Sequence, residues 1–112
     1  METAQIEVLC NDLGRLGAED VICRATEDLG QRLFEIQNLA ERGPREDLYK
    51  ALRALGAVAE QVGLTGLARV ARDVRLCINR GDLVAEAATL ARLARCGEGS
   101  LTQLWSLQDL SL

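Results

Sequence analysis

Histidine is absent from this 112-residue sequence, which also has few aromatic residues and little proline or lysine. Without an imidazole, the chain lacks the usual group for acid–base catalysis, for a Cys-His nucleophile and for phosphohistidine formation. Only three residues are aromatic and one is proline, whereas Leu, Ala, Glu and Arg, which favour helices, are abundant. The composition therefore predicts an all-α protein with an aliphatic core.

Several kinds of functional signal are missing as well. No charged-then-apolar signal pattern opens the sequence, and no apolar run approaches the roughly 18 residues of a membrane span. The net charge of -4 argues against long-range electrostatic attraction to nucleic acid or to an anionic membrane. We expect a cytoplasmic protein with no cofactor, no metal site, no nucleic-acid partner and no membrane partner. The cysteines are too far apart for a zinc or redox motif and are predicted to be small buried residues: Cys10, Cys23, Cys77 and Cys96.

The apolar residues recur at helical spacing in successive segments, and no segment has the period of a strand. The length suits a single domain over residues 1–112. Short connections between such helices predict an up-down antiparallel four-helix bundle with a short N-terminal helix and a C-terminal helical extension. The expected helices cover residues 3–16, 18–42 and 44–62, then a segment from a Thr65 cap to Arg80, a segment capped by Asp82, and a last one capped by Ser100 after a break at Gly97-Glu98-Gly99.

The segment Leu48–Leu67 combines a core face with an unusual exposed face. The residues expected to face the core are Leu48, Leu52, Leu55, Ala59 and Val62. The opposite face carries Glu46, Lys50, Arg53, Ala57 and Glu60, with Gly56 beside Ala57. A glycine inside a helix costs about 1 kcal/mol relative to alanine. Either this cost is tolerated, or another group approaches the helix at Gly56.

Four short motifs follow one another from this segment onward: R-A-L-G-A at Arg53–Ala57, V-G at Val62-Gly63, L-A-R-V-A-R-D-V at Leu67–Val74 and R-G-D at Arg80–Asp82. With them the sequence resembles histidine-containing phosphotransfer (HPt) domains over nearly its whole length. In the family, the central segment is H-x-L-K-G, whose histidine carries the phosphoryl group. Here Arg53 stands in the place of that histidine, Gly56 in that of the lysine and Ala57 in that of the glycine, while Gln61 falls where a polar residue often orients the site.

The substitution at Arg53 decides the predicted function. Arginine is permanently protonated and cannot accept a phosphoryl group as a neutral imidazole does, so phosphorelay chemistry is expected to be lost. The resemblance implies a docking surface for a receiver domain or a histidine kinase. We predict a non-enzymatic, pseudo-HPt adaptor of bacterial two-component signalling that modulates a phosphorelay without being phosphorylated. The predicted partner-binding residues are Lys50, Arg53, Gly56, Ala57 and Glu60.

Other interpretations of these residues stay open. Arg53 is also typical of a solvated helix position, and Gly56-Ala57 could pack against the N-terminal helix. The arginines Arg69, Arg72, Arg75 and Arg80 are interpreted as a solvated face. The apolar C-terminal segment around Trp105 either covers the core or forms a homodimer or a subunit contact. An enzyme is disfavoured because the acidic pairs are adjacent and point apart on a helix: Glu19-Asp20, Glu27-Asp28 and Glu46-Asp47.

Overall fold

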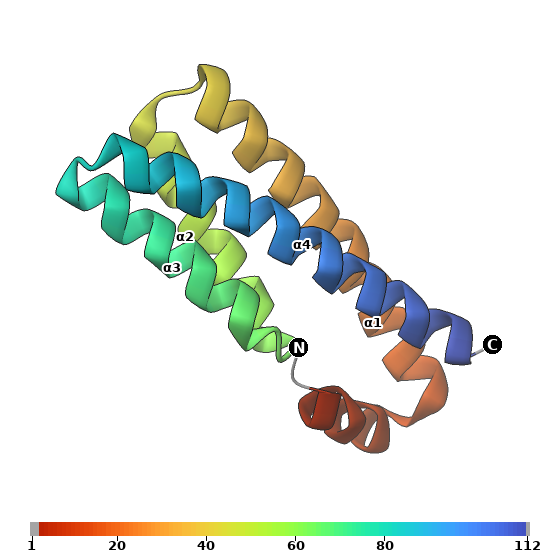
Figure 1. Ribbon diagram of the computed structural model, residues 1–112. Helices are drawn as coiled ribbons and strands as arrows, with labels where there is room; N and C mark the ends of the chain where they lie inside the picture. Colours follow the sequence, from red (N-terminus) through yellow and green to blue (C-terminus); the bar gives the residue numbers. More distant parts are fainter. Residues whose placement is uncertain (1–2, 112) are drawn as a thin grey trace.

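A computed structural model describes the backbone of residues 3–111 and the side chains of residues 20–107. Within these ranges the chain forms four helices and no strand: α1 (Thr3–Arg42), α2 (Arg45–Gln61), α3 (Thr65–Arg80) and α4 (Leu83–Ser111). Each helix packs against the next along the chain, and α1 also packs against α4 (Figure 1). The predicted all-α class and the helical bundle are therefore confirmed.

The core of the bundle consists of aliphatic side chains from all four helices. They include Ile22, Leu29 and Ile36 of α1, Leu48, Leu52, Leu55 and Ala59 of α2, Leu67, Val70 and Val74 of α3, and Leu93 and Leu104 of α4. Four of the five predicted core residues of α2 are buried, and Val62 is half-buried at the margin. Burying one such leucine stabilises the fold by about 1.5–3 kcal/mol. This core fixes which face of α2 remains exposed.

A tight turn at Gly63 connects α2 to α3. Gly63 has a φ of 79°, which is favourable only for a residue without a Cβ. The amide of Leu64 donates a hydrogen bond of 2.8 Å to the carbonyl of Ala59 and thereby satisfies one of the last acceptors of α2. Leu64, whose side chain is buried, occupies the N-cap position of α3, so the prediction that Thr65 caps this helix is wrong.

The turn between α3 and α4 repeats this arrangement at Gly81. Gly81 has a φ of 68°, and the amide of Asp82 donates to the carbonyl of Cys77 at 3.2 Å. The carboxylate of Asp82 accepts a hydrogen bond of 3.0 Å from the amide of Ala85. The predicted stop at Gly81 and the predicted cap at Asp82 are both confirmed.

Helix α1 extends over both segments that were predicted as separate helices, 3–16 and 18–42. Gly14 and Gly17 lie inside its bounds, because a glycine lowers helix stability by about 1 kcal/mol without ending the helix by itself. The separate short N-terminal helix is thus not confirmed. Its side chains lie outside the described residues.

Helix α4 continues through Gly97-Glu98-Gly99, where a break was predicted. A Cβ placed on Gly97 would lie 2.7 Å from Cδ1 of Leu33 on α1, so this glycine allows the two helices to approach each other. Ser100, predicted to cap a final helix, lies inside α4 and is only 8% exposed. The prediction of a break is therefore wrong, because packing against α1 outweighs the low helix propensity of glycine.

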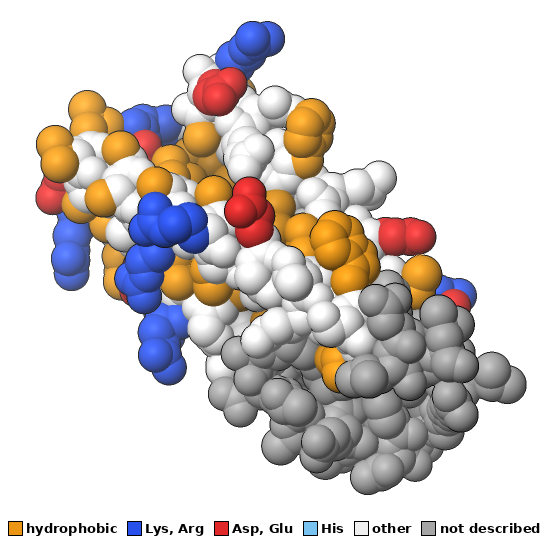
Figure 2. Space-filling model, turned by 45° about the vertical axis from the view of Figure 1, so that its right-hand side comes forward, with side chains coloured by type: hydrophobic (Ala, Val, Ile, Leu, Met, Phe, Trp, Pro, Cys, Tyr) orange, Lys and Arg blue, Asp and Glu red, His pale blue; other side chains and the backbone are white. Residues whose placement is uncertain are grey.

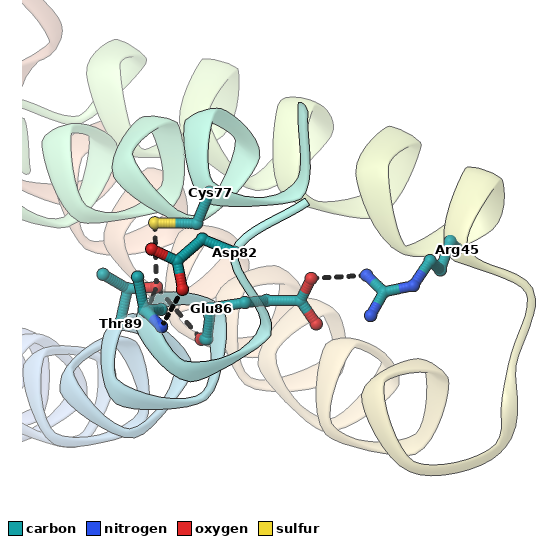
Figure 3. A network of polar contacts seen from close by, with 6 residues as sticks. Arg45, Cys77, Asp82, Glu86 and Thr89 are labelled. Carbon is teal, nitrogen blue, oxygen red and sulfur yellow. Dashed lines mark hydrogen bonds and ion pairs between the residues drawn. The ribbon is translucent and has the colours of Figure 1, made fainter. Parts of the chain in front are cut away.

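A buried charge joins α2 and α4, which are not adjacent helices in the described bundle. Figure 3 shows the carboxylate of Glu86, near the start of α4, extended toward the guanidinium of Arg45 in the first turn of α2. The Glu86 residue is buried, whereas Arg45 is exposed. The hydrogen bond to Glu86, and next its negative charge, raise the pKa of Arg45. Arg45 stays charged throughout the usual pH range, and the carboxylate beside it has a partner.

The cysteines only partly follow the prediction. Cys23 is exposed, which contradicts the expectation of a buried residue. It stands between core positions of α1, on the face that turns to solvent. Cys77 and Cys96 are half-buried, and Cys10 lies outside the residues with described side chains.

Candidate partner-binding surface

A hollow of about 330 Å³ lies between α2 and α3. Its lining consists of Arg53, Gly56, Ala57 and Glu60 from α2, and of Thr65, Ala68, Arg69, Arg72 and Arg75 from α3. We call this hollow the arginine groove. Four of the five residues predicted to bind a partner line it, which places them at one site on the surface.

The residues of α2 that line the groove face outward because the opposite face of α2 packs in the core. Leu52 and Leu55 are fully buried, so helical geometry turns Arg53, Ala57 and Glu60 outward. Apart from its chain neighbours and the backbone of α2 itself, no described atom lies within 4 Å of the position that a Cβ on Gly56 would take. Packing among the described side chains therefore does not account for this glycine, and the alternative that Gly56-Ala57 packs against the N-terminal segment 3–16 lies outside the residues with described side chains.

The groove is locally cationic in a chain of net negative charge. Arg53, Arg69 and Arg72 are exposed, Arg75 is half-buried, and Glu60 is the one acidic side chain among the described lining residues. No ion pair joins any of these four arginines to a described residue. Five other cationic side chains do have an acidic partner: Arg24, Arg32, Arg45, Lys50 and Arg92.

Arg75 forms one wall of the groove and is held by an aromatic ring. Its guanidinium carbon lies 5.8 Å from the centre of the Tyr49 ring on α2, within the range of a cation–π interaction. Its Nε is buried and has no hydrogen-bond acceptor. This guanidinium therefore keeps an unused donor at the junction of α2 and α3.

Lys50, the fifth predicted residue, does not line the arginine groove. It pairs with Glu46 at 3.6 Å and lies along a neighbouring hollow that includes Arg45, Tyr49 and Arg53. Arg53 belongs to both hollows. Lys50 is thus about one helical turn away from the centre of the candidate site.

Sequence reasoning missed the contribution of α3 to this site. Arg69, Arg72 and Arg75 were interpreted as part of a solvated face, yet they line the same groove as Arg53. Their spacing of three residues could have shown that they share one face of a helix. Arg80, the last member of that series, is exposed and lies outside the groove.

Two aromatic side chains are exposed outside the groove, one on α1 and one on α4. Phe34 is 66% exposed and Trp105 is 54% exposed. Trp105 borders a hollow with Leu101 of α4 and with residues of α1 that include Gly30. In Figure 2 the hydrophobic side chains form separate patches interrupted by polar surface. Trp105 therefore covers the core only in part.

The described residues show neither a metal site nor a membrane span, and no known relative is found. In the described part of the chain, no cluster of three or more cysteine, aspartate or glutamate residues is arranged to hold a metal ion. No helix there has the length and apolar character needed to cross a bilayer. No protein-family model, curated protein or solved structure matches the sequence or the fold.

Proposed function

We propose that this protein is a pseudo-HPt adaptor that binds a receiver domain or a histidine kinase and modulates a phosphorelay without carrying phosphate. The proposal includes a non-enzymatic role in the bacterial cytoplasm and an up-down antiparallel order of the helices. The observation that supports it most is that Arg53, Gly56, Ala57 and Glu60 line one groove, where Gly56 is half-buried and the other three are exposed. Arg53, Gly56 and Ala57 stand where the HPt segment that the sequence resembles has its histidine, lysine and glycine.

The binding mechanism follows from the chemistry of Arg53. Its guanidinium donates hydrogen bonds in a planar fork that matches a carboxylate or a phosphoryl group. A hydrogen bond of this charged kind is worth about 1.5–3 kcal/mol when water is excluded. The small residues Gly56 and Ala57 leave room for a loop of the partner to reach the guanidinium. Arg53 then occupies the acidic phosphorylation pocket of the partner without exchanging phosphate.

Binding measurements with receiver domains and kinases test this proposal. Arg53→Ala and Ala57→Glu are expected to weaken binding at least tenfold, which corresponds to about 1.4 kcal/mol. Arg80→Ala and Ala87→Glu are matched controls, because both residues are exposed on helices outside the groove. The proposal is wrong if neither groove variant changes any interaction, or if labelled phosphate is transferred onto the chain.

A homodimer or complex subunit is the second candidate, favoured by the exposure of Phe34 and Trp105. Aromatic side chains are enriched at the centres of protein interfaces. The molar mass in solution at two concentrations tests this candidate, with Trp105→Ser as the variant. A monomer of 12.2 kDa at both concentrations would exclude the homodimer.

A further inference from the structure

The four arginines of the groove come from both of its walls. Arg53 projects from α2, whereas Arg69, Arg72 and Arg75 follow one another at intervals of three residues on α3. Side chains at this spacing are neighbours on a helix, and each like-charged pair costs a few tenths of a kcal/mol. The chain therefore concentrates four positive charges at one place against the single carboxylate of Glu60.

Apart from Glu60, the acidic side chains that the structure describes lie outside the groove. Asp73 lies on α3 between Arg72 and Arg75, yet it pairs with Arg92 of α4 at 3.5 Å, on another side of the helix. The arginines that do have an acidic partner lie outside the groove. Arg75 in addition keeps a buried Nε–H without an acceptor. An anion from outside the chain would supply the missing negative charge.

The dimensions of the groove suit a small anionic molecule or group. The hollow of about 330 Å³ is at the lower end of the 300–1,000 Å³ typical of small-ligand sites. Gly56, Ala57 and Ala68 keep it open, because none of them has a side chain beyond Cβ. A single carboxylate engages one guanidinium fork, whereas linked phosphates present enough oxygens and charge for several.

We propose that the arginine groove is a binding site for a small molecule with two or more linked phosphate groups. Arg69 and Arg72 of α3 and Arg53 of α2 bind the phosphate oxygens from opposite walls, and Arg75 closes the end near Tyr49. The site needs no protein partner. This proposal therefore goes beyond the adaptor proposal and can be tested independently of it.

Calorimetric titration of the whole chain with inorganic pyrophosphate tests this site. We expect pyrophosphate to bind, inorganic phosphate to bind at least tenfold more weakly, and acetate not to bind at the same concentration. Higher salt should weaken the binding of pyrophosphate, because the attraction is between exposed charges. The absence of pyrophosphate binding, or equal affinity for acetate, would overturn the proposal.

Variants show whether pyrophosphate binds in the groove. Arg69→Gln and Arg72→Gln should each weaken its binding at least tenfold, whereas Arg80→Gln and Arg95→Gln, both exposed and outside the groove, should leave it unchanged. Glu60→Gln should strengthen binding severalfold, because it removes the only described carboxylate of the lining. A damaged fold cannot produce such a gain. Equal losses in the control variants would show general attraction to charge and refute the site.

Discussion

Replacement of Gly56 by alanine should stabilise this protein. Gly56 lies inside α2 and does not adopt a positive φ, so alanine fits the backbone there. Beyond its chain neighbours and the backbone of α2, a Cβ at this position would meet no described atom within 4 Å. The gain in helix propensity, about 0.8–1 kcal/mol, is therefore not offset by a clash. For a domain of this size it corresponds to a rise in Tm of about 4 °C.

Thermal and urea unfolding followed by circular dichroism measures this change, with the slope against urea concentration expected to stay constant. The matched control is Gly66→Ala in the first turn of α3, where a Cβ also meets nothing but the helix has barely begun. A loss of stability in Gly56→Ala would refute the reasoning, because it would show that the described surroundings of Gly56 are not open. If the glycine serves the groove, the more stable variant should also bind the partner or pyrophosphate less tightly.

Three further variants probe the fold. Gly97→Ala should lower the free energy of unfolding by about 1 kcal/mol, since overpacking against Leu33 exceeds the gain in propensity, and adding Leu33→Ala should remove that penalty in a double-mutant cycle. Leu52→Ala should cost about 2–5 kcal/mol in urea unfolding, because the side chain is fully buried. Asp82→Ala should cost about 1 kcal/mol through loss of the helix cap, whereas Asp82→Ser should be nearly neutral by the same assay.

The features that could be predicted from the sequence are those that depend on residues close together along the chain. The buried face of α2 follows from the spacing of its leucines, and the turn at Gly81-Asp82 depends on a left-handed glycine and a capping side chain. The continuation of α4 through Gly97 depends instead on Leu33, which lies on another helix. Local propensity favours a break there, and only the packing of α1 against α4 reverses it.

The same distinction between local spacing and packing of helices applies to the candidate site. Arg53, Gly56, Ala57 and Glu60 share a face of one helix, so their proximity could be predicted from spacing alone. To predict that Arg69 and its neighbours line the same groove, the rotation of α3 about its own axis would have to be known. That rotation is set by the buried residues of α3. The helical spacing of these arginines was visible in the sequence, whereas their position beside α2 was not.

The two proposals share Arg53 but differ in their use of α3, and this difference makes them separable. Docking onto an acidic pocket requires Arg53 together with the small residues Gly56 and Ala57, whereas a linked phosphate also requires Arg69 and Arg72. If both proposals hold, pyrophosphate must compete with the protein partner, because two anionic groups cannot occupy one guanidinium fork. Arg72→Gln should then abolish the competition while preserving most of the partner affinity. The groove would in that case act as a switch, in which a small phosphate compound controls the access of a signalling protein to Arg53.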